Sequence, residues 1–368
     1  MGYAAARGGL TAIKNAENLV RSLRDEHPSP PVGHDQLTGR LRLLVDKVMG
    51  EAGLWDPQLA SRALVEAEGD HVEATHLLRA HRSTLPRLAV SIAVHVDDAR
   101  VLRRVVPAYR EPGGNQILGR STDYSARMLS ARRNLPAVDI DRRSPGATTG
   151  DLRDGMRRMI SVLRSLDLLV DRRRQDDPEP FDITATPARP PAPRSARLAT
   201  MARAETGALI NQWYRNILGP DGYLHEVTLG EVRHSEIEVN VLHPLSGKST
   251  TVGYVRITEV EAIEDLDGDD EDRERFDAGF GACLGHNERK AIAMANLDIA
   301  CHRDAGRTSL EQSILMTTDG LDSAGFLEHL KLPHYVTFRS MVDRKFAVRE
   351  ARLTRTDLAP RGVGTDAR

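Results

Sequence analysis

The stretch EIEVNVLHPLSGKSTTVGYVRI, residues 236–257, decides the fold. It holds two runs in which apolar and polar residues alternate, a period that is typical of half-buried β-strands. A Leu-Ser-Gly-Lys turn at residues 245–248 separates the runs, so we expect two antiparallel strands within residues 223–260. The apolar positions that support this interpretation are Ile237, Val239 and Val241 in the first run, and Val252, Tyr254 and Ile257 in the second.

Helical periodicity dominates most of the sequence on either side of this hairpin. Residues 100–109 are β-branched and alternate, so they predict one more strand. The expected helices cover residues 10–25, 35–50, 57–66, 71–82, 122–132, 150–170, 196–218, 287–303 and 322–331. The fold class is therefore α+β, with an N-terminal helical layer, a central mixed region, a Pro-rich linker, and C-terminal antiparallel strands with packed helices.

Changes in composition divide the chain into five regions. Six prolines fall between residues 171 and 195, where neither a helix nor a sheet interior can propagate. The regions are an N-terminal helical domain (1–98), a mixed middle region (99–170), a Pro/Arg-rich linker or extended arm (171–195), a C-terminal α+β domain that holds a Gly-rich segment and a His pair (196–345), and a polar tail (346–368).

Charge and composition exclude several classes of protein. The net charge of −2 predicts no general nucleic-acid surface. No apolar run approaches the roughly 18 residues that cross a membrane, and the N-terminus lacks a signal peptide, so we expect a cytoplasmic protein. Two cysteines, Cys283 and Cys301, cannot form a disulfide framework or a self-contained iron–sulfur cluster. Neither a radical-SAM cysteine motif nor a P-loop is present.

Two histidines, His329 and His334, stand on either side of Pro333. On an unbroken helix, residues five apart diverge by about 140°. Pro333 ends the helix just before the second histidine, so the turn can bring both imidazoles to one metal ion. Zinc usually takes four ligands, so the others would come from elsewhere in the chain or from a partner. The alternative is a histidine at a helix terminus that interacts with the helix dipole.

A glycine-rich segment opens the helix expected at residues 287–303. Bare backbone N–H groups and the positive end of a helix dipole suit a phosphate. We expect Gly279, Gly281 and Gly285 to supply that backbone, and Lys290 to add charge. The spacing matches neither the Rossmann fingerprint nor the P-loop, and Glu288 in the first turn would repel an anion. Close packing around a helix rich in small residues is the alternative.

A shorter segment of the same kind, Arg7, Gly8 and Gly9, stands just before the first expected helix. An arginine and two glycines at a helix start could also hold a phosphate. Glycines near an N-terminus are more often simply pliable.

Several blocks, in one order along the chain, resemble the PhnI family of carbon–phosphorus lyase core subunits. Together they span about residues 3–340. They are Tyr3-x-Ala5-x-Arg7-Gly8-Gly9, Asp46-Lys47-Val48-Met49, Gly69-Asp70-x-Val72-Glu73-Ala74, Pro112-Gly113-Gly114-x-Gln116-x-Leu118-Gly119, Arg194-Ser195-x-Arg197-Leu198, Gly279-x-Gly281 through Met294-Ala295, and the residues from Leu327 to Phe338 around His329 and His334.

This resemblance implies an activity. PhnI-like subunits act with PhnG-, PhnH- and PhnL-type subunits to displace the purine of ATP or GTP by an alkylphosphonate. The product is a ribose 1-phosphonate 5-triphosphate, so the enzyme is a transferase; alone, the subunit acts as a purine nucleosidase. A radical-SAM subunit of PhnJ type then cleaves the C–P bond. The implied partners also include PhnK-type ATPase subunits, with two copies of this chain per complex.

The resemblance also implies that His329 and His334 bind zinc near the interface with the PhnJ-type subunit. It identifies no general acid for the purine, and Glu288 is a candidate by position alone. Two rival interpretations stay open at this point. The chain could be a non-catalytic scaffold that completes a partner's metal site, or a stand-alone nucleosidase unrelated to phosphonates.

Overall fold

A computed structural model gives the fold of the chain. It describes residues 9–110, 116–121, 156–170, 179–218, 227–265, 271–303, 308–317 and 341–357. The chain forms two compact units. One comprises Met1–Pro31 and Gly325–Arg368, and the other is Val32–Ala324. The five-region division expected from composition stays a prediction, since the larger unit includes parts of four of those regions.

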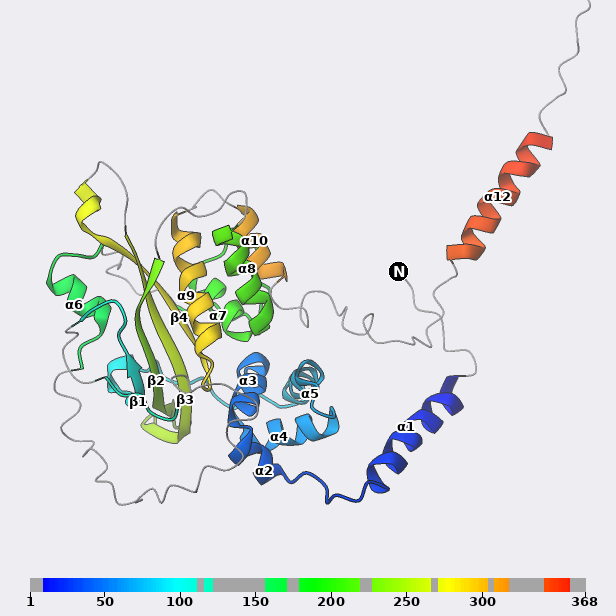
Figure 1. Cartoon of the computed structure of the whole chain (residues 1–368), viewed down its shortest axis with the longest axis horizontal. Coiled ribbons are helices and arrows are strands. Elements are labelled where there is room, and N and C mark those ends of the chain that lie inside the picture. The colour runs from blue at the N-terminus through cyan, green and yellow to red at the C-terminus, as the bar shows by residue number, and fades with distance from the viewer. Residues whose placement is uncertain are drawn as a thin grey trace, which may run out of the picture. The chain divides into compact units, whose positions relative to one another are not determined.

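An antiparallel sheet of four strands lies at the centre of the larger unit (Figure 1). Its strands follow one another in chain order: β1 (Arg100–Val105), β2 (Val227–Leu242), β3 (Ser249–Asp265) and β4 (Phe276–Leu284). The β2–β3 pairing, with Ile237 opposite Val255, confirms the hairpin expected from the alternating runs. The turn between these strands is closed by a 2.9 Å hydrogen bond from the His243 amide to the Lys248 carbonyl.

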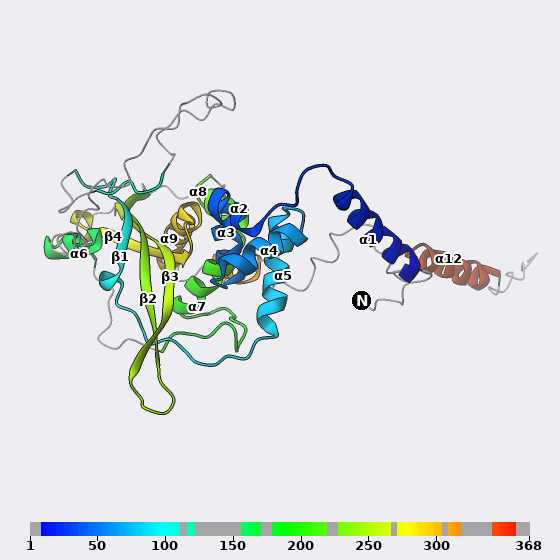
Figure 2. The same cartoon turned by 90° about the horizontal axis from the view of Figure 1, so that it is seen from below.

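Helices cover both faces of this sheet. The helix α9 (Glu288–Arg303) packs against β3 and β4. Both α7 (Arg194–Arg203) and α8 (Thr206–Leu218) pack against α9, and α10 (Thr308–Thr317) packs against α7 and α8. Figures 1 and 2 show α6 (Met159–Ser165) on the opposite side of the sheet. The main core lies between α9 and the sheet, where Val260, Met294 and Leu297 are fully buried.

The expected N-terminal helical layer is present in the larger unit. Its helices are α2 (His34–Arg40), α3 (Arg42–Ala52), α4 (Pro57–Glu66) and α5 (His71–Ser83). Asp56 caps α4 by accepting hydrogen bonds from two backbone amides at 3.0 Å, and Asp70 caps α5 in the same way. The single helix expected over residues 35–50 is wrong, because the backbone of Leu41 leaves the helical conformation and divides it in two.

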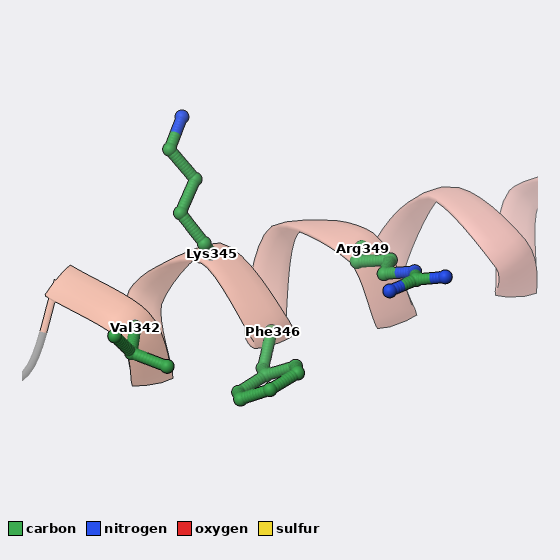
Figure 3. A pocket seen from close by; sticks show the side chains of 4 residues that line it. All are labelled: Val342, Lys345, Phe346 and Arg349. Carbon is green, nitrogen blue, oxygen red and sulfur yellow. The ribbon is translucent and has the colours of Figure 1, made fainter.

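The smaller unit contains two described helices, α1 (Gly9–Asp25) and α12 (Met341–Asp357). On α12, a shallow depression lies among Val342, Lys345, Phe346 and Arg349 (Figure 3). Val342 and Phe346 project from the same side of this helix, and Lys345 projects from another (Figure 3). The tail expected from residue 346 stays a prediction, and its first residues are helical, since α12 continues to Asp357. Within the described ranges, no helix has the length and apolar character needed to cross a membrane.

Other expectations have mixed outcomes. The expected strand over residues 100–109 is β1, and the long helix expected over 196–218 is interrupted between α7 and α8. The helix expected over 150–170 shortens to α6 in the part that the structure describes, and α10 was not expected. The helices expected at 122–132 and 322–331 lie outside the described residues.

Candidate functional site

The glycine-rich segment forms a strand before it forms a turn. Gly279 and Gly281 lie within β4 and face α9. A Cβ atom on Gly279 would lie 2.1 Å from the Ala295 carbonyl oxygen, and one on Gly281 would lie 2.2 Å from that of Ala291. Only glycine permits so close an approach of helix and strand. The turn expected at these two positions is therefore wrong, and close packing accounts for both glycines.

The turn that does open α9 centres on Gly285, whose backbone has the left-handed φ of 76°. The Gly285 amide donates to the Arg256 carbonyl at 2.8 Å, and the Thr258 hydroxyl donates to the Gly285 carbonyl at 2.6 Å. The Asn287 amide donates to that hydroxyl oxygen at 3.0 Å, while its side-chain Nδ2 donates to the Asp46 carbonyl at 2.9 Å. The start of α9 is thus fixed between β3 and α3.

Glu288, the first residue of α9, places a carboxylate at the start of this helix. Arg103 of β1 donates from Nε to its Oε1 atom, and His286 Nε2 lies 3.3 Å from the same oxygen. Arg103 also donates from Nη1 to the Leu118 carbonyl at 2.7 Å. Burial alone would raise the pKa of Glu288, but the hydrogen bonds from His286 and Arg103 lower it below its ordinary value. Glu288 is therefore ionised at neutral pH.

His286 lies between an arginine and this carboxylate. Arg42 Nη1 lies 3.2 Å from His286 Nδ1, and arginine is only a donor, so Nδ1 accepts that hydrogen bond. In the neutral ring the proton then sits on Nε2, which points at Glu288. Arg42 also pairs with Asp46 at 3.3 Å. The start of α9 thus brings together two arginines, two carboxylates and an imidazole.

A second imidazole, that of His234 on β2, stacks on His286. The ring centroids are 4.6 Å apart and the ring planes differ by 25°. Burial first, and then the electrostatic effects of the neighbouring His286 and Arg42, lower the pKa of His234 to about 4. His234 is therefore neutral at pH 7. Such a cluster can orient an anion with its arginines and N–H groups, and can place a carboxylate beside a developing positive charge.

The sequence of the chain matches a known protein family over most of its length. The family described as bacterial phosphonate metabolism protein (PhnI) matches residues 2–352. This chain belongs to the PhnI family. The HtxH protein of Stutzerimonas stutzeri is 40% identical over 364 residues, which cover 94% of this chain and 95% of that relative.

Two further relatives carry the name alpha-D-ribose 1-methylphosphonate 5-triphosphate synthase subunit PhnI. The protein from Rhizobium meliloti (strain 1021) is 33% identical over 351 residues, covering 93% of each chain. The protein from Escherichia coli (strain K12) is 34% identical over 348 residues, covering 93% of this chain and 96% of that relative. Each of these alignments covers nearly all of the chain.

The residues expected to bind a nucleotide do not all lie at this site of the PhnI chain. Gly285 forms the turn, whereas Lys290 is buried on α9, with 1% of its surface exposed. Its charge acts on Cys283, whose pKa burial raises to about 11 against the opposing effect of Lys290. Arg7 and Gly8 lie outside the described residues, and Gly9 is the first residue of α1. Nucleotide binding by these residues stays a prediction, and Gly285 is the one that lies in the turn before α9.

The predicted metal ligands of this PhnI chain, His329 and His334, lie in the range 318–340, outside the described residues. Within the described ranges, no group of three or more His, Cys, Asp or Glu side chains is arranged to hold a metal ion. That finding includes the cluster at the start of α9. Zinc binding stays a prediction that rests on the two histidines.

The opposite face of the sheet holds a buried ionic network that the sequence analysis missed. Glu231 accepts from Arg104 Nε at 2.9 Å and from the Met159 amide at 2.8 Å, and Glu261 accepts from the Ile160 amide at 3.0 Å. Two strand carboxylates thus accept hydrogen bonds from amides at the start of α6 that have no partner within the helix. The network comprises Arg104, Arg158, Arg233, Glu231, Glu259 and Glu261, each with less than a tenth of its surface exposed. Its role is to anchor residues 156–160 on the sheet.

The sequence analysis also missed Arg103 of β1 and Arg42 of α3, whose side chains reach the start of α9. Arg103 stands in a run of alternating residues, and nothing in that run indicates that its side chain meets Glu288, 185 positions later. Arg42 shares one helix face with Asp46, which reads as an ordinary pair at i, i+4. Only the fold reveals that both arginines converge on one helix terminus.

Proposed function

We propose that this chain is the PhnI subunit of a carbon–phosphorus lyase core complex in phosphonate catabolism. In that complex it displaces the purine of ATP or GTP by an alkylphosphonate and yields a ribose 1-phosphonate 5-triphosphate. The names of the two synthase-subunit relatives support this assignment. Family membership over residues 2–352 supports it as well.

The observation that carries the proposal is the ionised Glu288 at the start of α9. Displacement of a purine leaves positive charge on the ribose C1 and ring oxygen in the transition state. A carboxylate already fixed beside that charge stabilises it without reorganisation; one preorganised donor that faces an oxyanion, the case of opposite sign, is worth about 3–4 kcal/mol. Arg103 and His286 hold the Glu288 carboxylate in one orientation.

The lowered pKa of Glu288 assigns its role within the proposal. A carboxyl group that donates a proton at pH 7 needs a raised pKa, whereas that of Glu288 is lowered. Glu288 therefore acts as a fixed anion and does not protonate the departing purine. The positive end of the α9 dipole would face the anionic groups of the substrates, whereas the amides of Gly285 and Asn287 already donate to Arg256 and Thr258.

The remaining elements of the proposal concern partners and a metal. We expect PhnG-, PhnH- and PhnJ-type subunits and PhnK/PhnL-type ATPases to assemble with this chain. His329 and His334 would hold a zinc ion shared with a partner, and no step derived for Glu288 depends on that ion. With water in place of a phosphonate, the same site would act as a purine nucleosidase.

The test uses the complex assembled from this chain and its PhnG-, PhnH- and PhnL-type partners. ATP or GTP is supplied with and without methylphosphonate, and free purine base and ribosyl products are measured. Base release with formation of the 1-methylphosphonate 5-triphosphate supports the proposal. A folded, assembled complex that releases no base from either nucleotide would contradict it and favour the scaffold interpretation.

A further inference from the structure

A short segment, Gln116–Ser121, lies along the outer edge of the sheet and is called the strap below. Its Ile117 pairs with Arg104 of β1 through two backbone hydrogen bonds, of 2.8 and 2.9 Å. The Gln116 side chain accepts a further hydrogen bond from the Val106 amide at 3.1 Å. The strap is therefore joined to β1 at the strand edge that β2 does not occupy.

The strap approaches β1 closely at Gly119. This glycine has a φ of 62°, and a Cβ atom there would lie 2.6 Å from the Leu102 carbonyl oxygen and 3.2 Å from Arg103 Cβ. A side chain at this position would push the strap away from the strand. The close approach brings the backbone of the strap beside the side chain of Arg103.

One guanidinium connects the strap to the start of α9. Arg103 donates from Nη1 to the Leu118 carbonyl at 2.7 Å and from Nε to the Glu288 carboxylate. Only 7% of the Arg103 side chain is exposed, so little water competes for these two bonds. The planar fork of arginine can make both bonds at once, which a lysine ammonium cannot do in the same geometry.

Leu118 gives the strap a surface that can meet a ligand. Half of its surface, 51%, is exposed although the residue is apolar. Its carbonyl and the Glu288 carboxylate bind the same guanidinium, so Leu118 lies near the start of α9. An exposed apolar side chain, on a backbone that shares one guanidinium with a carboxylate, suits the apolar face of a purine or a ribose.

We infer that Arg103 is a positioning residue that fixes the Glu288 carboxylate and holds the strap as one wall of a purine nucleotide site. The inference rests on the proposed function, since it names the substrate class that meets the strap. It assigns Arg103 no contact with the substrate. Its action passes through Glu288 on one side and through Leu118 on the other.

The experiment compares Arg103→Gln and Arg103→Lys with Arg100→Gln in the assembled complex. Arg100 lies on the same strand, is 55% exposed, and forms only a 3.6 Å surface pair with Glu236. Hydrogen exchange of the strap is measured with and without ATP or GTP, and base release is measured across pH. Thermal melting of each complex shows whether the variants are folded.

We expect nucleotide to slow exchange in the strap of the wild-type and Arg100→Gln complexes. In Arg103→Gln, exchange in the strap rises, nucleotide no longer slows it, and kcat/KM falls by about 100-fold, as misplacement of a catalytic group predicts. The acid limb of the pH profile moves to higher pH, because Glu288 loses a donor that lowers its pKa. Arg103→Lys keeps the charge and so keeps the acid limb, but strap exchange still rises.

Two results would overturn the inference. One is a folded Arg103→Gln complex with wild-type strap protection and wild-type kcat/KM. The other is a wild-type strap whose exchange ATP and GTP leave unchanged. Failure of the proposed function has a different signature, since the wild-type complex would then release no base whatever the strap does.

Discussion

Replacement of Gly281 by alanine tests whether the glycine-rich strand serves packing. The new Cβ atom would lie 2.2 Å from the Ala291 carbonyl oxygen and 2.8 Å from Met294 Cβ. The first of these is helix backbone, so relief requires that α9 move away from β4. Overpacking of a core costs typically about 1–3 kcal/mol, and a backbone obstacle places this change at or above about 3 kcal/mol. At roughly 2 °C per kcal/mol for a large domain, we expect Tm to fall by about 6 °C or more.

The matched control is Gly253→Ala in β3 of the same sheet, where a Cβ atom meets nothing within 4 Å. This change should be neutral, or should stabilise the protein by up to about 1 kcal/mol, because alanine orders a strand at lower entropic cost. Thermal melting and nucleotide affinity are measured for both variants. If Gly281→Ala melts within about 1 °C of the wild type and loses only nucleotide affinity, the packing argument fails and the phosphate-loop interpretation returns.

Two further predictions concern buried ionisable groups. The pKa of His234 in the folded chain is about 4, below its ordinary 6.5. Between these two pH values the unfolded chain therefore binds more protons than the folded chain. The free energy of unfolding then falls as pH drops through this window, by up to about 1.4 kcal/mol per pH unit. His234→Gln should remove this contribution to the pH dependence of the free energy of unfolding, measured by urea titration at several pH values. An unchanged pH dependence would contradict the lowered pKa. Glu231→Gln should cost about 3–5 kcal/mol, because it removes a buried negative charge that pairs with both Arg104 and Arg233. Glu66→Gln, which breaks an exposed pair with Arg62, should cost less than about 1 kcal/mol, and equal costs would refute the burial argument.

The β2–β3 hairpin could be predicted from sequence because apolar side chains alternate along it. The strand β4 could not, because its buried positions are Asp277, Gly279, Gly281 and Cys283. These side chains are small or polar, so the inward face gives no apolar signal, and the glycines resemble a loop. What makes them buried is the helix that packs on them, and that helix comes later in the chain.

The buried ionic network on the sheet face opposite α9 could not be predicted from sequence, for a related reason. Glu231 and Arg233 alternate with apolar residues on β2, as Glu259 and Glu261 do on β3. A charged face on a strand usually indicates contact with solvent. Here that face is covered by residues 156–160, whose amides and carbonyls pair with the network. Local pattern cannot reveal a cover supplied by a distant segment.

At the candidate site, too, local features could be predicted from the sequence, and contacts between distant segments could not. Glu288 and Gly285 could be identified from sequence, because a glycine and an acidic residue at a helix start follow local rules. Arg103 and the strap could not be identified, because their contacts join segments far apart in the chain. The pairing of His329 with His334 stays a prediction from the position of Pro333.

The most direct test of the proposed chemistry is base release by the assembled complex that carries Glu288→Gln. Glutamine keeps the shape of the side chain but removes the negative charge beside the ribose. We predict that kcat falls by about 100- to 1,000-fold while the complex stays assembled. Glu238→Gln, on an exposed position of β2, should keep wild-type activity. Wild-type base release by a folded Glu288→Gln complex would contradict the account.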